Sequence, residues 1–293
     1  MNITDNDKKA ADLVKKTEIW PDEIQLPDGV EFHEHIEDNL NDSQLDVTYF
    51  TQKNTSELRP AMIFIHGGSW KLGDKKQFYR QAAYLAAKHN IFGVCVEYRL
   101  SGAAKFPSAL EDCKCAIRWT RSVAEKFLID TNRIGICGGS AGAHLSALVA
   151  VTNGGKEYEG TGPYQSFSSD VHLVVLFNGH FDMNDQLKDH VQDNDMHTFF
   201  GGDPWEIPEV YGAASPFLRV SKDASPMLFL HGDMDHFPHR QSIAMNERLR
   251  HYGVHSELEI YKGKKHAWFN FEPDNGITTE RITKFIEKIF KLY

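Results

Sequence analysis

The sequence predicts an α/β fold with one mostly parallel central sheet and helices on both faces. Five continuous apolar runs, each followed by a helical pattern, predict parallel strands buried on both sides, at residues 61–65, 92–96, 133–137, 171–177 and 226–230. Two earlier stretches, 30–36 and 44–50, alternate apolar and polar residues, as half-buried antiparallel strands do. No linker or repeat divides residues 1–293, so we expect a single domain.

The remaining elements follow in chain order. An amphipathic pattern predicts a first helix at residues 5–17, and a last strand is expected at 257–261. Further helices are predicted at residues 77–89, 108–127, 141–151, 240–252 and 278–292. Residues 153–170 and 184–211 fit no such alternation and predict functional loops. We expect cap elements from residues 1–28 and 184–212, the second being the better candidate for a cap over a substrate pocket.

Composition and charge narrow the class of partner. A net charge of −9 argues against nucleic acid, and 41% hydrophobic residues are ordinary for a globular protein. The sequence therefore favours a small-molecule substrate and leaves the oligomeric state open, a homodimer included. No stretch approaches the roughly 20 apolar residues of a membrane span. Residues 1–9 contain no apolar signal core, so a cytoplasmic protein is expected, with secretion after removal of a signal as the alternative.

The strongest motif is Gly138-Gly139-Ser140-Ala141-Gly142, a G-x-S-x-G pattern between a buried strand and a helix. A serine on so sharp a turn needs small neighbours, and its side chain is exposed at the edge of the sheet. Ser140 is therefore the predicted nucleophile. The alternative is that these small residues only allow the helix to pack closely on the strand.

A Gly-rich turn, His66-Gly67-Gly68-Ser69-Trp70, follows the first buried strand. Backbone N–H groups at such a turn can point at a developing oxyanion, so Gly68, Ser69 and Ala141 are the predicted donors. His66 is expected to hold the turn by hydrogen bonds rather than to transfer protons. Considered alone, the two glycines could equally form an ordinary turn.

The acid and the base are expected after later strands. Asp235 in His231-Gly232-Asp233-Met234-Asp235 is the predicted acid, with Asp233 bracing the loop and Asp182 as the alternative acid. His266, which follows the last strand, is the predicted base. The chain order Ser, Asp, His then agrees with that of G-x-S-x-G hydrolases.

No metal ligands are predicted for catalysis. The run from His231 to His236 superficially resembles a dinuclear metal cluster, but Asp233 stands where a His is expected. Cys113 and Cys115 fall on different faces of a helix and do not form a metal-ligand pair. Arg99 is expected to pair with Asp112 in a structural role.

Aromatic residues near the predicted catalytic loops are candidate substrate contacts. Trp70 adjoins the Gly-rich turn, Trp268 follows His266 by two residues, and Trp205 and Tyr211 lie in the second inserted stretch with Phe199. Such side chains predict a compact apolar pocket, although each could instead pack the cap.

Together with Tyr98-Arg99-Leu100, Phe106-Pro107 and Asp112, these motifs resemble the esterase/lipase superfamily of α/β-hydrolases over about residues 45–290. The chain resembles small carboxylesterases that include bacterial acetyl-xylan and feruloyl esterases, and is also similar to hormone-sensitive-lipase-like enzymes. The resemblance implies an α/β-hydrolase fold and an acyl-enzyme mechanism without a cofactor, and it says little about the substrate. The second inserted stretch is rich in Asp, Asn, Gln and Gly and lacks the broad apolar face of a lipase lid, so short-acyl or aryl-acyl ester substrates are expected, those of carbohydrates among them.

The chain departs from the family pattern at two points. Ser69 replaces the third Gly of the usual His-Gly-Gly-Gly motif, and the following Trp70 resembles kynurenine formamidases, which keeps an arylformamide substrate open. The loop His236-Phe237-Pro238 is one residue shorter than the family's common spacing, which weakens the placement of Asp235. A non-catalytic small-molecule receptor is a rival interpretation, and a prolyl-oligopeptidase-like peptidase is a weaker one because few residues precede the first buried strand.

Overall fold

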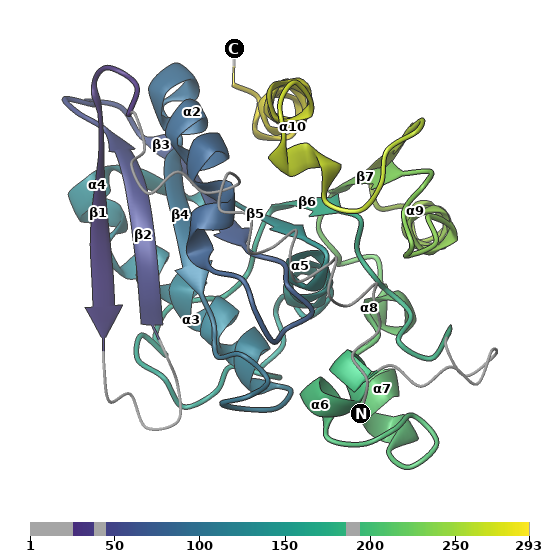
Figure 1. The fold of residues 1–293 in the computed structure, drawn as a ribbon. Helices are drawn as coiled ribbons and strands as arrows, with labels where there is room; N and C mark the ends of the chain where they lie inside the picture. Colours follow the sequence, from purple (N-terminus) through teal and green to yellow (C-terminus); the bar gives the residue numbers. More distant parts are fainter. Residues whose placement is uncertain (1–25, 38–44, 186–193, 293) are drawn as a thin grey trace.

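The structure, a computed structural model, describes residues 26–37, 45–185 and 194–292. Eight strands form one sheet in the order β1-β2-β4-β3-β5-β6-β7-β8 (Figure 1). Each predicted strand is present close to its expected bounds, and β5 departs most because it begins at residue 129. The strands are β1 (Val30–Glu37), β2 (Leu45–Gln52), β3 (Arg59–Ile65), β4 (Phe92–Glu97), β5 (Ile129–Gly139), β6 (Leu173–Phe177), β7 (Met227–Gly232) and β8 (Ser256–Tyr261).

Strand direction divides this sheet into two parts. β1 and β2 pair antiparallel, as do β2 and β4. Every pair from β4–β3 to β7–β8 is parallel. The prediction of antiparallel strands first and parallel strands afterwards is confirmed. Because parallel strands end at the same edge, the loops after β3, β5, β6, β7 and β8 meet there.

Helices cover both faces of the sheet. α2 and α10 pack on one face, and α3, α5 and α9 pack on the other (Figure 1). The predicted helix 108–127 is in fact two helices, broken at Val123, and the predicted first helix lies outside the described residues. The helices of these layers are α2 (Tyr79–His89), α3 (Ser108–Ser122), α4 (Ala124–Phe127), α5 (Ala141–Val151), α9 (Arg240–His251) and α10 (Asp274–Phe290), with 3-10 turns η1 (Lys75–Phe78) and η3 (Trp268–Asn270).

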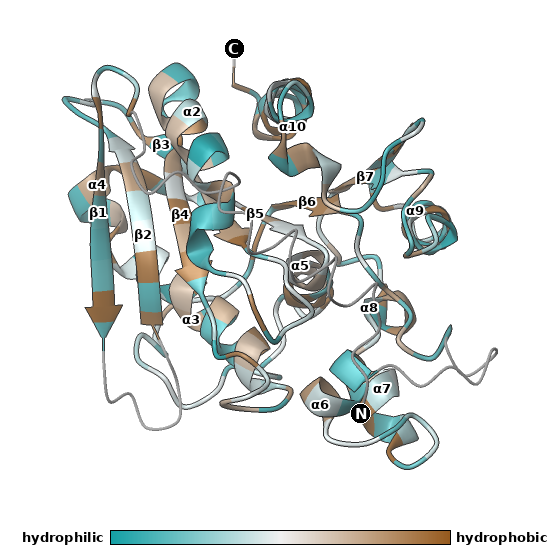
Figure 2. Cartoon of the chain, viewed as in Figure 1, coloured by the Kyte–Doolittle hydropathy of each residue, from teal (hydrophilic) through white to brown (hydrophobic). Residues whose placement is uncertain are grey.

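The core has two halves because side chains alternate along each buried strand. On β3, Ile63 and Ile65 join the cluster beneath α3 and α5, whereas Met62 and Phe64 join the cluster beneath α2 and α10. All four are at most 1% exposed. Figure 2 shows a different contrast, between hydrophobic residues on the interior strand β4 and mostly hydrophilic residues on the edge strand β1.

The second inserted stretch contains two short helices, α6 (Asn194–Phe200) and α7 (Pro208–Ala213), followed by α8 (Pro216–Arg219). Phe200 of α6 and Tyr211 of α7 lie with ring centroids 4.5 Å apart. A cap role for residues 1–28 and 184–212 stays a prediction. Within the described residues, no helix combines the length and the apolar character that crossing a bilayer requires.

Candidate active site

Ser140 stands at the turn between β5 and α5. Its backbone angles, φ 54° and ψ −118°, lie outside the regions that most residues adopt, which costs roughly 1–3 kcal/mol. The turn is this tight because α5 packs directly against β3. A Cβ on Gly142 would lie 2.1 Å from the carbonyl oxygen of Ile65. The small residue at 142 is therefore a packing requirement of the elbow.

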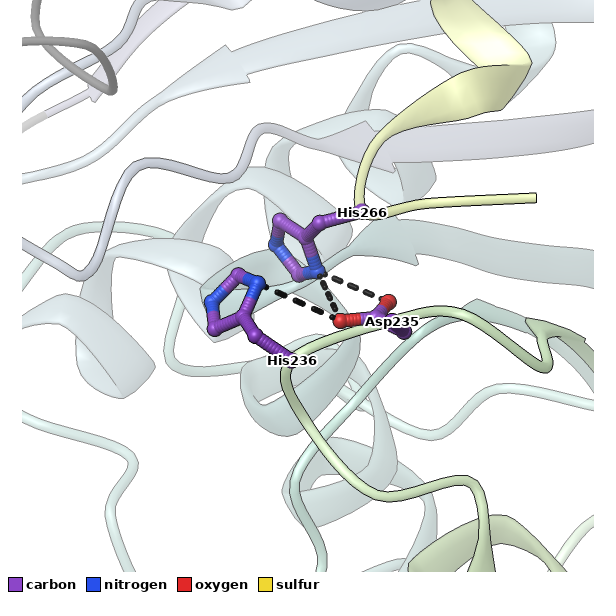
Figure 3. Close-up of side chains that lie close together, drawn as sticks. All are labelled: Asp235, His236 and His266. Carbon is purple, nitrogen blue, oxygen red and sulfur yellow. Dashed lines mark hydrogen bonds and ion pairs between the residues drawn. The ribbon is translucent and has the colours of Figure 1, made fainter. Parts of the chain in front are cut away.

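Three side chains from separate loops form a hydrogen-bonded relay. His266 Nε2 lies 3.0 Å from Ser140 Oγ, and His266 Nδ1 lies 2.9 Å from both carboxylate oxygens of Asp235 (Figure 3). Since a carboxylate only accepts, the Nδ1 proton points to Asp235 and leaves Nε2 free to accept the serine proton. Burial alone would raise the pKa of Asp235. The hydrogen bond from His266, the charge of that imidazole and the N–H of Phe237 outweigh burial, so the pKa lies below its usual value.

The structure brings Asp235, and not the alternative Asp182, to the imidazole of His266 within the described residues. Asp182 Oδ1 accepts a hydrogen bond from the N–H of Asn184 instead. Asp233 accepts one from the N–H of Gly263 at 2.6 Å, in the loop that carries His266. Asp233 was expected to brace the loop after β7, and this bond ties that loop to the one that carries His266.

The predicted oxyanion turn lies against the nucleophile. A Cβ on Gly67 would lie 3.2 Å from Ser140 Cβ. Gly68 and Ser69 both have positive φ, 117° and 52°, so the chain turns sharply at this point. Ala141 opens α5, where the first N–H groups have no acceptor within the helix.

Contacts behind this turn explain how it keeps its shape. His66 Nδ1 lies 2.7 Å from the carbonyl oxygen of Gly67, and its ring stacks on Tyr98 at 4.2 Å. The predicted structural role of His66 is confirmed. Arg99 donates to the buried carboxylate of Asp112 at 2.8 Å, which confirms the expected ion pair at the end of β4.

A small depression opens beside Ser140, with about 240 Å³ of empty space, part of which is open solvent. Asn178, His180 and Phe237 were not predicted as lining residues. Asn178 and His180 follow β6 directly, so the rule that ligands bind at strand carboxyl ends could have found them. The lining residues are Ser69, Trp70, Ser140, Ala141, Asn178, His180 and Phe237.

Only one of the four predicted substrate-binding aromatics, Trp70, lines this depression. Trp205 is 52% exposed to solvent, and Tyr211 is buried, with its hydroxyl donating to the carbonyl oxygen of Gly202. Trp268 is buried in the other half of the core, beneath α2 and α10. The residue before it, Ala267, has φ 61°, so the chain turns away immediately after the base.

Trp70 is held rigidly by its neighbours. Its ring stacks on Phe199 at 4.8 Å, and its Nε1–H donates to His144 Nδ1 at 3.1 Å. The other ring nitrogen of His144 donates to the carbonyl oxygen of Ala214 at 2.8 Å. Burial lowers the pKa of His144 to about 3, so this ring stays neutral and keeps both bonds near pH 7.

Asn178 is a further neighbour of His266. Its amide nitrogen Nδ2 lies 2.8 Å from His266 Nδ1, and its backbone N–H donates to the carbonyl oxygen of Leu230 on β7. With the imidazole proton on Nδ1, the amide must turn so that Oδ1, which has no other hydrogen-bond partner among the described residues, accepts from that N–H. The residue is fully buried. The end of β6 therefore places a polar side chain beside the same imidazole nitrogen that Asp235 contacts.

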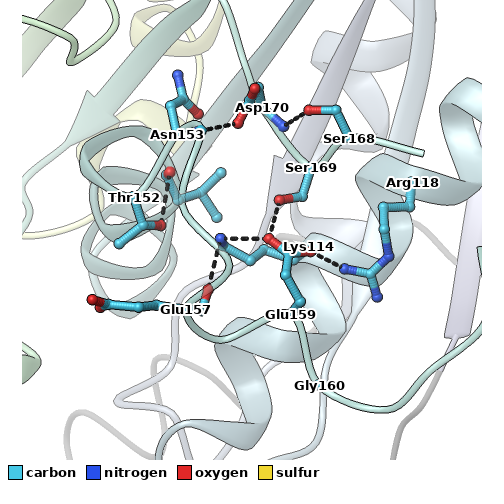
Figure 4. Close-up of polar contacts among 12 residues, drawn as sticks. Lys114, Arg118, Thr152, Asn153, Glu157, Glu159, Gly160, Ser168, Ser169 and Asp170 are labelled. Carbon is cyan, nitrogen blue, oxygen red and sulfur yellow. Dashed lines mark hydrogen bonds and ion pairs between the residues drawn. The ribbon is translucent and has the colours of Figure 1, made fainter. Parts of the chain in front are cut away.

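The first inserted stretch, residues 153–170, contributes no residue to the lining of this depression. Glu159 anchors it to α3 through Lys114 and Arg118, and also accepts from Ser169 (Figure 4). Burial alone would raise the pKa of Glu159. Hydrogen bonds from Ser169 and Lys114, with the positive charges of Lys114 and Arg118, outweigh burial and hold the pKa below its usual value. These contacts give the stretch a structural role.

Comparisons with known proteins agree on fold and family. The BD-FAE family model matches residues 45–249. A truncated carbohydrate esterase from gut microbiota superposes with a TM-score of 0.76 at 28% identity, covering 91% of this chain and 99% of that one. The butyrate-bound esterase Est2 of Thermogutta terrifontis gives 0.75 at 26%, covering 89% and 95%. The predicted α/β-hydrolase fold is confirmed.

Curated relatives are longer than this chain. Esterase LipC of Mycobacterium tuberculosis is 34% identical over 65% of this chain and 48% of its own length. The isoprenylcysteine alpha-carbonyl methylesterase ICME of Arabidopsis thaliana is 27% identical over 74% and 52%. The chain thus spans about half the length of the curated relatives it matches.

Proposed function

The chain belongs to the BD-FAE family, and we propose on that premise that it is a serine carboxylesterase of short-acyl or aryl-acyl esters. The observation that carries the proposal is the unbroken relay from Ser140 Oγ through His266 to the buried Asp235, with bonds of 3.0 and 2.9 Å. A serine hydroxyl is a weak nucleophile until a base within hydrogen-bond reach removes its proton.

The first step is acyl transfer to the enzyme. Ser140 Oγ attacks the ester carbonyl as His266 Nε2 takes its proton, and Asp235 stabilises the imidazolium that forms. The N–H groups of Gly68, Ser69 and Ala141 receive the oxyanion, each donor contributing roughly 3 kcal/mol to the transition state. His266 then protonates the leaving alcohol.

The second step releases the acid. With the alcohol gone, His266 removes a proton from water, which attacks the acyl carbon and regenerates Ser140. Every proton passes through His266, so this mechanism requires no metal or organic cofactor.

The aromatic wall of the depression supports small acyl groups. Its wall beside Ser140 contains buried Trp70, whose stacking on Phe199 and bond to His144 hold it in place. Phe237 forms a further part of the wall. A rigid aromatic wall beside Ser140 favours a short chain or a flat ring over a long alkyl chain. Short-acyl esters of carbohydrates also fit this proposal, because only the acyl group of the ester enters the depression.

A fluorophosphonate probe tests the nucleophile directly. We expect covalent labelling of Ser140 in the folded wild type and none in Ser140→Ala. Ser146→Ala is the matched control, since Ser146 is also buried in α5 and its hydroxyl has no hydrogen-bond partner among the described residues. Ester hydrolysis near the wild-type rate in folded Ser140→Ala would overturn the assignment.

An arylformamidase is the second candidate, favoured by the Ser69-Trp70 pair in the oxyanion turn. A panel of aryl acetates, acetylated xylan, feruloyl esters and N-formylkynurenine decides between them through relative kcat/KM. A preference for N-formylkynurenine would favour the amide hydrolase. No turnover and no probe labelling would favour a non-catalytic binding protein.

A further inference from the structure

A second imidazole lies beside the base. His236 directly follows Asp235, and its Nδ1 lies 3.5 Å from Asp235 Oδ1. Its ring centroid is 4.5 Å from that of His266, with the two rings at 61°. One ligand atom from each of these three residues lies within 4.8 Å of the other two (Figure 3).

We propose that Asp235, His236 and His266 form an inhibitory site for a divalent transition metal such as Zn²⁺. The inhibitory role rests on the function proposed above, whereas the metal site itself does not. The sequence predicts no catalytic metal, and the ion proposed here blocks the reaction rather than taking part in it.

The geometry is close to what such an ion requires. Bonds of about 2.0–2.1 Å in a tetrahedral site separate neighbouring ligand atoms by about 3.3 Å. The separations from Asp235 Oδ1 are 2.9 Å to His266 Nδ1 and 3.5 Å to His236 Nδ1. The side chain of His236 is 66% exposed, so it can adjust to close the remaining gap and the ion can enter from solvent.

The donor set also selects the kind of ion. Two imidazole nitrogens and one carboxylate suit Zn²⁺, Ni²⁺ or Cu²⁺, whereas Mg²⁺ prefers oxygen ligands and retains its water. A third nearby imidazole, that of His231, is already engaged: its two nitrogens lie 2.8 Å from Ser242 Oγ and 3.1 Å from the carbonyl oxygen of Phe237. Water is then expected in the fourth position.

Inhibition follows from the position of one proton. Catalysis needs that proton on His266 Nδ1, pointing to Asp235, so that Nε2 can accept from Ser140. To bind a metal, Nδ1 must give up its proton and offer its lone pair to the ion. The proton of the neutral ring then sits on Nε2. Nε2 then donates to Ser140 Oγ and cannot act as the base.

Other metal sites are weaker explanations for inhibition. The four cysteines are buried, which raises the pKa of each thiol and disfavours metal-binding thiolates; they are Cys95, Cys113, Cys115 and Cys137. Among the described residues, the other three-ligand cluster is His197, Asp203 and Glu206 in the second inserted stretch. His197→Asn is therefore the matched control for His236→Asn.

The first experiment titrates Zn²⁺ against ester hydrolysis. The activity of each protein is expressed relative to its own activity in the presence of a chelator. We expect the half-inhibitory Zn²⁺ concentration to rise at least about tenfold in His236→Asn, because a ligand is lost. It should stay unchanged in His197→Asn, and Mg²⁺ should not inhibit. Equal inhibition of the wild type and His236→Asn, or relief in His197→Asn alone, would overturn the site.

Calorimetry separates the site from the esterase. Folded Ser140→Ala keeps all three ligands, so it should bind one Zn²⁺ with the wild-type affinity, and the double variant Ser140→Ala/His236→Asn should bind at least about tenfold more weakly. No such difference would overturn the metal site whatever the enzyme does. Zn²⁺ binding at this site without slower fluorophosphonate labelling of the wild type would overturn the inhibitory role. Failure of the proposed function would instead appear as no hydrolysis or labelling in chelator alone.

Discussion

Replacing Asp235 by Asn tests the proton arrangement of the relay without changing its shape. The N–H of Phe237 donates to Asp235 Oδ1 at 2.8 Å, and this bond should hold the amide oxygen of the new Asn at that position. The amide NH₂ then takes the place of Oδ2, 2.9 Å from His266 Nδ1. The amide oxygen at the Oδ1 position, also 2.9 Å from His266 Nδ1, can still accept from an Nδ1–H. The NH₂ can donate to Nδ1 only when the imidazole proton is on Nε2, so the amide favours the tautomer that cannot accept from Ser140.

The expected loss follows from this tautomer. An equivalent carboxylate-to-amide change in a serine protease lowers kcat by about 10⁴, or roughly 5.4 kcal/mol at 1.36 kcal/mol per decade. We expect a loss of this order in kcat for Asp235→Asn, with KM little changed because the acyl pocket is intact. Steady-state hydrolysis of p-nitrophenyl acetate measures both constants.

Two neighbouring carboxylates provide controls for this prediction. Asp233 only accepts from the N–H of Gly263, and an Asn there keeps that bond, so Asp233→Asn should cost less than about tenfold. Asp182→Asn should likewise have a small effect. A loss in Asp235→Asn no larger than that in Asp233→Asn would refute the reasoning, and a larger loss in Asp182→Asn would move the acid to the loop after β6.

Three further predictions concern the base, the core and the pocket. Adding Asn178→Asp to Asp235→Asn should recover at least about tenfold in kcat, because the amide of Asn178 already lies 2.8 Å from His266 Nδ1; Asn178→Ser in the same background is the control, and equal activities of the two would count against this placement. Burial lowers the pKa of His144 to about 3 and that of His231 to about 4, so the unfolded chain binds more protons than the folded one between those values and pH 6.5. The melting temperature should therefore be highest above pH 6.5 and fall as the pH is lowered toward 4. His144→Gln, which keeps both neutral hydrogen bonds, should show a shallower fall. Equal dependence of the melting temperature on pH in the two proteins would contradict this. Finally, hydrolysis of p-nitrophenyl acetate and butyrate should far exceed that of palmitate, with no rise in rate at a lipid interface; a preference for palmitate would contradict the rigid wall at Trp70.

The sequence predicts the framework better than the pocket, for physical reasons. Buried parallel strands are continuous apolar runs, so β3 to β7 are visible without any tertiary information. The elbow is equally local, because a strained serine demands small neighbours on both sides. Val123 shows the limit of such patterns: it continues the helical pattern of residues 108–127, yet α3 ends just before it.

Side-chain direction depends on contacts that a sequence does not display. Trp268 stands two residues from the base, but the left-handed Ala267 sends it into the core beneath α10. Tyr211 and Trp205 share one inserted stretch, and only one of them is buried. Asn178 escaped prediction because an isolated Asn after a strand is common, and its proximity to His266 depends on the pairing of β6 with β7.

The contact from Trp70 through His144 to Ala214 links three parts of the chain that lie 74 and 70 residues apart. It ties the chain just after the inserted stretch to the turn beside Ser140. A relative could exchange residues 184–212 and so acquire a new specificity, provided that the carbonyl at Ala214 still met His144. A graft that shifted this carbonyl would release the indole beside the oxyanion turn and alter catalysis without touching a catalytic residue. In a library of such grafts, residue 214 is therefore the junction to hold constant.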